Sequence, residues 1–520
     1  MTNPAPSEPR EIELKFALEP GESPEILRFL GAAETPETRL DAVYFDTRGL
    51  ALRERGLSLR LRREDGKVVQ TLKQRQEGGG AFGRAQWEAS VEATGIDRRA
   101  LRGTPAAEAL LGLGSPLPLV DVTTRRTRVM IEGDAEAKIE VSVDRGQAAA
   151  AGRSSDFEEL ELELKSGSPE GLFAYAGPLQ SRFDLELSFI AKADRGFALL
   201  DEAALTAEKF HAAAISADAT AGEAFRAFVR EALEHLARNA RLFRSSPEPE
   251  AVHQMRVGAR RLRAIIETFG KVARDDRRQV LDDELRWFGK ELDAARDLDV
   301  FLGGAWRRAE RGARRASETA ATATDVRRRL ETARVAAYAR AGAAAASPRL
   351  RRLFFDLLAW AEVGAWTSPG APGARRRDRT AAAFARKRLA SARRRLVDAG
   401  EGLAQLSAPR RHKVRIRAKQ VRYAAEAFAP LFGGREGSHD FIARLKALQD
   451  DLGALNDIAV AKAIAGDYPP AGKLIGRQKR REKALLASAA HHLAAFAKAQ
   501  KFWKTARPQP ASAQGVAAQR

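Results

Sequence analysis

The spacing of apolar residues changes once along this chain, and the change limits the folds that the chain can adopt. Before about residue 200, apolar and polar residues alternate, as in RLDAVYFDT at 39–47 and EELELELKSG at 158–167. From about residue 218, apolar residues recur every three or four positions, as in VHQMRVGARRLRAIIETF at 252–269. Alternation is typical of strands, and a period of 3.6 is typical of amphipathic helices. The sequence therefore predicts a strand domain followed by a helical domain.

The composition is typical of globular domains in a reducing compartment. The chain has 520 residues, too many for one ordinary hydrophobic core, and 44% of them are apolar. It contains no cysteine, which excludes disulfides, thiolate catalysis and cysteine-ligated metal. It shows no apolar N-terminal run and no stretch long enough to span a bilayer. We therefore expect a cytoplasmic protein without a signal peptide or membrane segment.

The net charge of +20 is unevenly divided between the two parts. Residues 1–205 carry 27 Lys and Arg against 35 Asp and Glu, whereas the remainder carries 62 against 34. A strongly basic domain attracts polyanions, so the helical part is predicted to bind one. The alternative is that arginine only keeps long helices solvated.

The helical part contains an internal repeat. VHQMRVGARRLR at 252–263 matches RHKVRIRAKQVR at 411–422, and LDAARDLDV at 292–300 matches LGALNDIAV at 452–460. The two pairs are offset by 159 and 160 residues, so the spacing inside the repeat is kept. This pattern predicts a duplicated helical bundle.

The strand part, with polar residues along many alternating strands, favours a closed antiparallel barrel with a polar interior. The fold class that we expect is a multi-domain α+β protein, with short helices beside the barrel. The expected parts are a barrel at 8–203, a connection at 204–217, helical repeats at about 218–366 and 376–505 within a domain at 218–505, and a disordered tail at 506–520.

Charged residues recur on one face of the predicted strands. The pattern E-x-E-x-K occurs at 11–15 and again at 161–165, and residues two apart on a strand share a face at a spacing of about 7 Å. The acidic set consists of Glu11, Glu13, Glu140, Asp144, Glu161 and Glu163, with Glu159 beside the second motif. The basic set consists of Lys15, Arg60, Arg62, Lys73, Arg84, Arg126, Arg128, Lys165 and Lys192, with Arg195 close to the last.

Several carboxylates inside one barrel would repel one another unless a counter-charge were supplied. A divalent cation supplies it, and an all-oxygen ligand set suits Mg²⁺ or Mn²⁺ rather than zinc. Arginine and lysine side chains would then bind the oxygens of a phosphate chain. The alternative is that these residues form solvated outer faces of the strands. Six strands with matching charged faces make this alternative the weaker one.

A basic stripe occurs in both helical repeats. His253, Arg256, Arg260 and Arg263 stand at the same offsets as His412, Arg415, Lys419 and Arg422, and Arg286 corresponds to Lys446. On a helix each set of four lies on one face, where like charges repel. An anionic ligand explains both stripes better than solubility does. Metal binding by His253 or His412 is disfavoured because neither has a second ligand at helical spacing, and nucleic acid is disfavoured by the scarcity of aromatic residues for base stacking.

The strand part resembles the CYTH domain, whose members are the triphosphate tunnel metalloenzymes. The resemblance rests on EIELK at 11–15 followed in order by YFDT, LRLR, TLK, RTR, VDRG, ELELELKSG and AKADRG, and it covers about residues 8–203. It implies an eight-stranded antiparallel tunnel that hydrolyses or cyclises triphosphates with a divalent metal.

The resemblance also implies roles for the matching residues. Metal ligands would be Glu11, Glu13, Glu161 and Glu163, assisted by Asp144 and Glu140, and the catalytic group would comprise Glu11, Glu13, Lys15 and Asp144. Phosphate oxygens would be bound by Lys15, Arg60, Arg62, Lys73, Arg126, Arg128 and Lys192, with Arg84 and Lys165 extending this set. Which carboxylate acts as general base stays open.

The helical part resembles the CHAD domain over about residues 218–505, through H-x-x-R and L-G-x-x-[RN]-D elements in both repeats. The sequence departs from the second element at Asp293, where the second repeat has Gly453, and at Asn456, where the first has Arg296. The resemblance implies two four-helix bundles around a basic groove that binds inorganic polyphosphate.

Together these features predict a metal-dependent inorganic triphosphatase whose helical module binds polyphosphate. That module could hold the enzyme on polyphosphate granules. The alternatives are a non-catalytic polyphosphate-binding scaffold, or a tunnel enzyme that hydrolyses nucleoside or thiamine triphosphate or cyclises adenylate. The sequence predicts no membrane partner and leaves the oligomeric state open.

Overall fold

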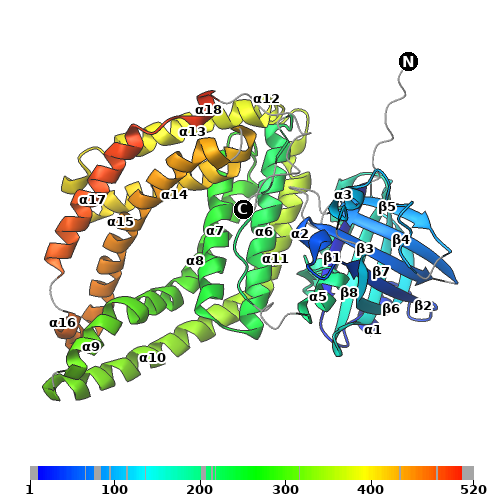
Figure 1. The fold of residues 1–520 in the computed structure, drawn as a ribbon, viewed down its shortest axis with the longest axis horizontal. Helices are drawn as coiled ribbons and strands as arrows, with labels where there is room; N and C mark the ends of the chain where they lie inside the picture. The colour runs from blue at the N-terminus through cyan, green and yellow to red at the C-terminus, as the bar shows by residue number, and fades with distance from the viewer. Residues whose placement is uncertain are drawn as a thin grey trace. The chain divides into compact units, whose positions relative to one another are not determined.

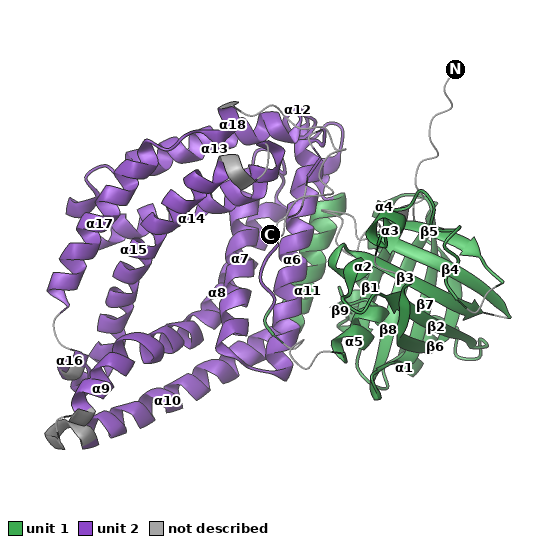
Figure 2. Cartoon of the chain, viewed as in Figure 1, with its two compact units in different colours: residues 1–207, 348–363 green, residues 208–347, 364–520 purple. Residues whose placement is uncertain are grey.

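A computed structural model of the chain divides it into two compact units (Figure 2). The first unit contains residues 1–207 and 348–363, and the second contains residues 208–347 and 364–520. The structure describes residues 10–64, 66–74, 84–92, 95–112, 115–134, 136–200, 206–211, 213, 215–216, 218–315, 317–432, 435–475 and 478–505. The expected disordered tail lies outside the described residues.

The first unit is built around one antiparallel sheet that closes on itself (Figure 1). Its strands are β1 (Arg10–Leu18), β2 (Thr38–Asp46), β3 (Leu57–Glu64), β4 (Lys67–Gln74), β5 (Arg84–Ser90), β6 (Leu117–Glu132), β7 (Lys138–Ala150), β8 (Arg153–Ser166) and β9 (Glu186–Leu187). They follow the order β5-β4-β3-β2-β6-β7-β8-β1-β9, and β5 also pairs with β1. Eight strands therefore form a closed ring, which confirms the predicted barrel, and the two-residue β9 lies outside the ring on β1.

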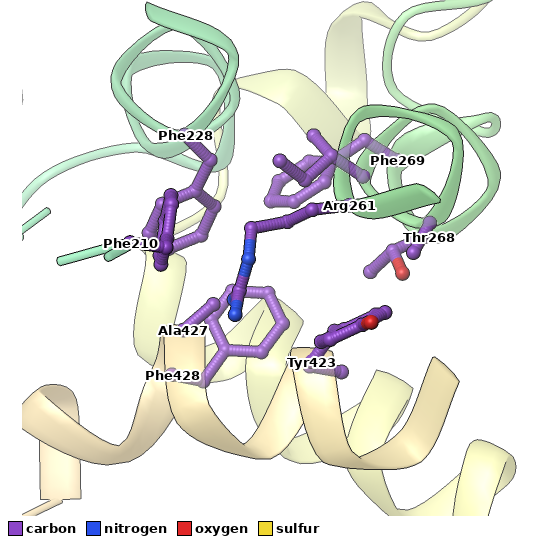
Figure 3. Close-up of a pocket in the computed structure, with 11 residues that line it drawn as sticks. Phe210, Phe228, Arg261, Thr268, Phe269, Tyr423, Ala427 and Phe428 are labelled. Atoms are coloured by element: carbon purple, nitrogen blue, oxygen red, sulfur yellow. The ribbon is translucent and has the colours of Figure 1, made fainter. Parts of the chain in front are cut away.

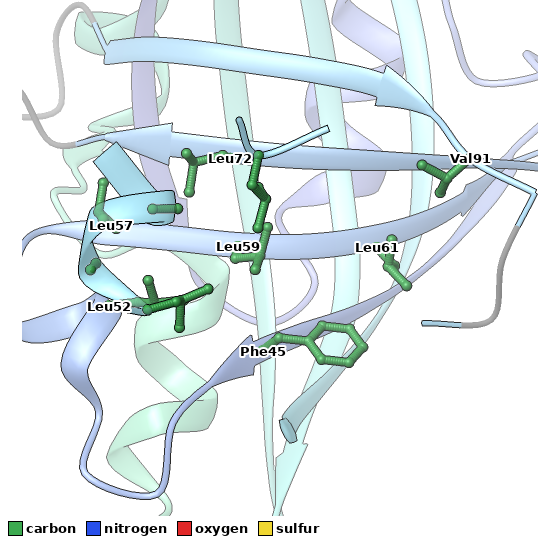
Figure 4. Packing of buried hydrophobic residues seen from close by; sticks show 11 residues of the cluster. Phe45, Leu52, Leu57, Leu59, Leu61, Leu72 and Val91 are labelled. Carbon is green, nitrogen blue, oxygen red and sulfur yellow. The ribbon is translucent and has the colours of Figure 1, made fainter. Parts of the chain in front are cut away.

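The barrel carries its apolar residues on the outside and its charged residues within. Leu57, Leu59 and Leu61 alternate with Arg60 and Arg62 along β3. The leucines pack under short helices in a buried cluster (Figure 4). The helices of this unit are α1 (Ser23–Phe29), α2 (Ala51–Glu54), α3 (Pro105–Ala109), α4 (Pro169–Phe183), α5 (Lys192–Ala198) and α11 (Pro348–Val363). Because the helices cover the outer face, the charged face points into the barrel.

Helix α11 comes from the stretch that we predict from the sequence to be part of the first helical repeat, yet its contacts place it in the first unit. Phe355 packs with Phe16 of β1 and Phe173 of α4, at ring-centroid distances of 6.3 and 5.9 Å. Arg351 donates a 2.9 Å hydrogen bond to the carboxylate of Asp184. The outer face of β1 is therefore covered by a helix that lies 332 residues further along the chain, counted from Phe16 to Pro348.

Replacing Phe355 with alanine is expected to lower the free energy of unfolding of the first unit by about 3–5 kcal/mol. Phe355 is only 3% exposed, so the substitution leaves a cavity against Phe16 and Phe173. Chemical denaturation of the full chain measures the effect. Leu111→Ala is the control, because Leu111 is 75% exposed and its loss should change the stability little. Equal effects of the two substitutions would contradict this role for α11.

The second unit is helical throughout its described length. Its helices are α6 (Ala221–Ser245), α7 (Pro249–Phe269), α8 (Arg277–Phe301), the π-turn η2 (Leu302–Trp306), α9 (Arg307–Arg315), α10 (Ser317–Ala345), α12 (Ala374–Arg377), α13 (Ala381–Ala399), α14 (Ala408–Phe428), α15 (Arg435–Asp467), α16 (Pro469–Ile475), α17 (Lys479–Ala497) and α18 (Phe502–Thr505). Three 3₁₀ turns join them, η3 (Ala365–Thr367), η4 (Leu403–Gln405) and η5 (Ala429–Phe432).

The repeat is visible as two bundles with equivalent helices. Helices α6, α7, α8 and α10 pack together, as do α13, α14, α15 and α17. The caps of α6 and α13 are also equivalent: Thr220 and Thr380, 160 residues apart, each accept a backbone hydrogen bond with their side chains. These two residues form a β-bridge with each other, which joins the bundles where they begin. The predicted duplicated bundle is thus confirmed, and the repeat extends to its first helix.

The bundles meet in an aromatic core. Phe269 and Phe428 are repeat-equivalent, and their ring centroids lie 5.8 Å apart. Beside them Arg261 lies over the rings of Phe210 and Tyr423, at 3.7 and 4.6 Å (Figure 3). The small apolar pocket here has a volume of only about 20 Å³, which is room for a water molecule and no more. This contact therefore holds the two repeats together rather than binding a ligand.

No helix in the described part of the chain combines the length and the apolar character that crossing a lipid bilayer requires.

Candidate functional site

The two E-x-E-x-K motifs lie side by side inside the barrel. Strands β1 and β8 pair antiparallel, with Glu13 opposite Glu163 and Lys15 opposite Glu161. Because the strands run in opposite directions, the lysine of the first motif meets the first glutamate of the second. The Nζ atom of Lys15 lies 2.7 Å from Glu161.

A layer of three carboxylates crosses β7 and β8 next to this pair. Asp144, Glu159 and Glu161 each have a carboxylate oxygen within 4.8 Å of the others. Asp144 and Glu159 are fully buried. The register of β7 and β8 places Asp144 directly opposite Glu159, so the layer follows from strand pairing. We call these three residues the Asp144 layer.

Four cations surround the Asp144 layer. Lys192, at the start of α5, lies 2.8 Å from Asp144 and 2.7 Å from Glu161, and it also contacts Glu159. Arg126 of β6 binds Asp144 through two hydrogen bonds of 2.7 and 2.6 Å and reaches Glu161. Lys15 and Arg195 each lie 3.6 Å from Glu159.

This mutual neutralisation decides which groups are ionised. Burial alone would raise the pKa of Glu161, but Lys15, Lys192 and Arg126 hold that pKa well below its usual range. Burial alone would lower the pKa of Lys192, but Asp144, Glu159 and Glu161 raise that pKa well above its usual value. The pKa of Lys15 is raised in the same way by Glu159 and Glu161. Glu161 is therefore a carboxylate, and the two lysines are ammonium ions, at physiological pH.

A second layer lies one strand repeat further along. Glu13, Glu140 and Glu163 are joined by strand pairing across β1, β8 and β7. Lys165 lies 2.8 Å from Glu163 and 3.7 Å from Glu140. The structure thus separates the predicted metal-binding carboxylates into two layers. Glu161 and Glu163 are two residues apart on β8, and Asp144 and Glu140 are four apart on β7, which correspond to about 7 and about 13 Å along the strands.

The opposite side of the barrel is mainly basic. The cations Arg60 and Arg62 on β3, Lys73 on β4 and Arg128 on β6 have the inward-facing strand positions. Glu64 balances part of this charge, at 2.7 Å from Arg128 and 3.5 Å from Arg62. Tyr44 of β2 shares the interior; burial alone would raise its pKa, but Arg60 beside it lowers that pKa. The carboxylates thus lie mainly on the neighbouring strands β7, β8 and β1, with Lys15 and Lys165 among them, while the cations lie mainly on β4, β3 and β6.

The residues present fit a divalent cation. The donors of the Asp144 layer are all carboxylate oxygens, which suit Mg²⁺ or Mn²⁺. Glu159 is fully buried, and its carboxylate contacts Lys192 and lies 3.6 Å from Lys15 and from Arg195. A buried carboxylate that is held ionised by cations in this way retains oxygen lone pairs that can bind a metal ion.

The structure also includes residues that the sequence predictions did not assign as ligands. Glu159 belongs to the Asp144 layer, Arg195 pairs with it, and Glu64 and Tyr44 line the basic side. Their positions in the alternating pattern were the only signal, because Glu159 is two residues from Glu161 and Glu64 two from Arg62. The backbones of Glu11 and Arg84 pair with each other, but their side chains lie outside the described structure.

The second unit holds the basic stripes in one cavity of about 950 Å³. Helices α7 and α8 of the first repeat form one side, and α14 with α15 of the second form the other. Of the predicted residues, those that line the cavity are His253, Arg256, Arg260, Arg263, Arg286, His412, Arg415 and Lys419. The two basic stripes, which are 159 residues apart in the sequence, therefore face the same cavity.

Two predicted residues of the stripes do not line this cavity. Arg422 lies one turn beyond Lys419 and pairs with Glu426 at 3.6 Å, and Lys446 is exposed on α15. The cavity wall contains further charged residues that the sequence predictions did not include, among them Lys290, Arg296, Asp297 and Asp457. Burial and the nearby Arg296 lower the pKa of His253 to about 4, so this histidine is neutral at physiological pH.

Comparisons with known families give separate matches for the two parts of the chain. A CYTH domain model matches residues 9–195, and a CHAD domain model matches residues 227–466. No curated protein matches the chain. Among solved structures, the CHAD domain of the plant Ricinus communis is 31% identical, over 59% of this chain and 99% of that one, with a TM-score of 0.44.

Solved structures that match a smaller share of the chain include two described as cyclases. A putative adenylate cyclase from Bacillus halodurans is 18% identical over 34% of this chain and 91% of that one, with a TM-score of 0.27. A putative adenylyl cyclase from Hippeastrum, described as having a dominant triphosphatase activity, is 16% identical over 35% of this chain and 91% of that one, with a TM-score of 0.25.

The family models confirm both resemblances seen in the sequence and assign them in the predicted order. The chain therefore contains a CYTH domain at residues 9–195 followed by a CHAD domain at residues 227–466, and through the second it belongs to the CHAD family.

Proposed function

We propose that the barrel hydrolyses inorganic triphosphate with Mg²⁺ or Mn²⁺. The observation that carries this proposal is the division of the barrel interior into an acidic side and a basic side. A metal ion would bind to the acidic side and a phosphate chain to the basic side. A triphosphate bound together with its metal ion would therefore contact both sides. Solvated strand faces, the alternative considered from the sequence, do not account for carboxylates that are fully buried.

The residues of the Asp144 layer, with Glu13, Glu140 and Glu163 beyond it, would hold the metal. When bound, the metal would supply positive charge that polarises the phosphoryl group and orients a water molecule. The chain's own cations would do the rest. Arg60, Arg62, Lys73 and Arg128 would bind phosphate oxygens, while Lys15 and Lys192, as ammonium ions, would stabilise charge that develops on the leaving phosphate.

The helical unit would bind inorganic polyphosphate in its cavity. Cations from both repeats line this space, and a linear polyanion is the ligand class that such a distribution of charge favours. Binding there would keep the enzyme at polyphosphate in the cytoplasm, including polyphosphate granules. The proposed function does not depend on whether the protein forms oligomers.

The test is phosphate release from inorganic triphosphate, long-chain polyphosphate and ATP, each with Mg²⁺ or Mn²⁺ and with a chelator. We expect triphosphate to be hydrolysed fastest and the chelator to abolish activity. Faster release from ATP would favour a nucleoside triphosphate as substrate. Absence of release from all three substrates, with polyphosphate still bound, would favour the non-catalytic scaffold.

A further inference from the structure

The two sides of the cavity in the helical unit differ in how their cations are neutralised. On the first-repeat side, α8 supplies carboxylates to the stripe of α7. Arg256 lies 2.6 Å from Asp293, and Arg263 lies 2.9 Å from Asp282. Arg286 also pairs with Asp282, at 2.7 Å. Arg256, Arg263 and Arg286 are therefore paired within the chain. Arg260, Arg278, Lys290 and Arg296 on the same side have no ion-pair partner within 4.0 Å among the described residues.

The second repeat lacks these partners. Position 453 is glycine where the first repeat has Asp293, and position 442 is isoleucine where it has Asp282. Arg415, the equivalent of Arg256, donates a 3.1 Å hydrogen bond to the neutral side chain of Asn456. Arg415 therefore has a neutral partner where Arg256 has a carboxylate.

Several cations on the cavity wall have no ion-pair partner within 4.0 Å among the described residues. Three of them also act electrostatically on one another, Arg260 of α7 and Arg415 and Lys419 of α14, and we call these the unpaired triad. The Nε atoms of both arginines are buried without a hydrogen-bond acceptor in the described part of the chain. Buried donors without acceptors are costly and are normally satisfied by a ligand or by water. The triad is thus a built anion site that draws on both repeats.

Charges on the surrounding helices act on Lys419. Burial lowers its pKa first, and Arg260 and Arg415 then lower it further, followed by Arg256 and Arg422, so that the pKa falls to about 6. On α15, Asp457 is close enough to interact with Lys419, but burial raises the pKa of Asp457 itself. On α8, the pKa of Asp297 is raised by burial and by nearby Asp293, and Asp297 interacts mainly with Arg256.

The remaining neighbours do not supply a counter-charge. His412 lies two turns before Lys419 on α14. Burial and the nearby Arg415 lower the pKa of His412, so this histidine is neutral at physiological pH. On α13, which also packs against α14, Arg388 interacts with Arg395 and Glu267 instead. Among the described residues Lys419 therefore has no ion-pair partner within 4.0 Å, and the cations around it outweigh its interaction with Asp457.

We propose that the unpaired triad is the tightest phosphate subsite of the cavity, and that phosphate binds there together with a proton that Lys419 takes up. This inference rests on the proposed polyphosphate binding by the helical unit. In the free cavity Lys419 is the one member of the triad that can shed its charge, because arginine stays protonated. An incoming phosphate chain supplies the missing counter-charge, so the neutral amine becomes an ammonium ion and donates to a phosphate oxygen.

The sign of the pH dependence follows from this linkage. The lysine has a low pKa in the free cavity and a higher one in the complex, so binding takes up a proton. Affinity should therefore rise as pH falls, by up to about tenfold per pH unit between the two pKa values, and should stop rising below about pH 6. His253, with a pKa of about 4, would add protons only in more acidic solution.

The experiment is isothermal titration of linear inorganic polyphosphate into the full chain at pH 8, without divalent cation, in buffers of different ionisation enthalpy. The slope of the binding enthalpy against the buffer enthalpy counts the protons taken up. We expect up to about one proton for the wild type and none for Lys419→Arg, whose side chain stays charged. Lys419→Gln should also take up none and should bind more weakly. Lys462→Arg, outside the cavity, should behave as the wild type.

The same titrations locate the subsite. Arg260→Gln should weaken binding at least tenfold more than Arg263→Gln one turn away, because Asp282 already neutralises Arg263. Equal losses from the two substitutions, or proton uptake that persists in Lys419→Arg, would overturn the inference and leave polyphosphate binding standing. No binding by the wild type at any pH would instead overturn the proposed function of the helical unit, and this inference with it.

Discussion

Replacing Glu161 with glutamine is expected to lower metal-dependent phosphate release from triphosphate by about 10²- to 10³-fold. Glu161 stands at the centre of the Asp144 layer and contacts Lys15, Lys192 and Arg126. Because these cations hold its pKa well below the usual range, the group is ionised, and glutamine removes a full negative charge at nearly constant shape. The metal would lose a ligand, and three cations would lose a counter-charge.

The measurement is the rate of phosphate release as a function of metal concentration. A higher metal requirement together with a lower maximal rate would identify Glu161 as a metal ligand. Glu132→Gln is the matched control, since Glu132 is an exposed glutamate on β6 and should leave the rate unchanged. Thermal unfolding of both variants tests whether the barrel still folds. An unchanged rate in a folded Glu161→Gln protein would refute the proposed site.

Reversing two charges in the cavity, Arg256→Glu with Arg415→Glu, is expected to weaken polyphosphate binding by about 10²-fold or more. The two residues are repeat-equivalent and face the same cavity. Arg415 would lose a charge-assisted hydrogen bond to phosphate, which contributes about 1.5–3 kcal/mol, or about one to two factors of ten. Arg256 is already paired with Asp293, so its reversal acts mainly by placing a further negative charge beside that carboxylate. The new carboxylates also repel the ligand, and the salt dependence of binding should become shallower.

The control changes the net charge equally without touching the cavity. Arg328 and Arg329 on α10 are 73% and 63% exposed, and Arg328→Glu with Arg329→Glu should reduce binding much less. If both double variants lost the same affinity, binding would depend on overall charge and not on the cavity. Hydrolysis of triphosphate by the barrel should persist in both, because neither pair of residues lies in the first unit.

Several features of the candidate site could be predicted from strand alternation. Glu13, Lys15, Asp144 and Glu161 lie where the pattern places them, on the inner face of the barrel, and Lys192 reaches the same carboxylates from the start of α5. Alternation assigns a side chain to a face but does not say how far along the barrel it lies. From the sequence we therefore predict Glu161 and Glu163 as ligands, with Glu159 beside them, whereas the register of β7 and β8 places Glu159 opposite Asp144.

In the helical unit too, some features of the candidate site could be predicted from the sequence and others could not. The repeat spacing predicted the stripes, and the structure brings eight of the ten chosen residues to one cavity. Arg422 satisfies the same spacing as Lys419 but lies beyond the end of the wall, where it pairs with Glu426. Helical period indicates which face a residue occupies, whereas the crossing of two helices decides where that face meets its partner.

Local periodicity, the internal repeat and residue type predict the order of the two domains, the closed barrel with its charged face, the duplicated bundle and most of the charged residues of both candidate sites. The tertiary contacts are needed to show that Glu159 belongs with Asp144 and that Asp293 and Asp282 pair with Arg256 and Arg263. They also show that Lys419 has no ion-pair partner within 4.0 Å among the described residues and that α11 packs on the barrel. These are matters of register and of contacts between distant segments, and no local pattern encodes them because they depend on which surfaces the whole chain buries together.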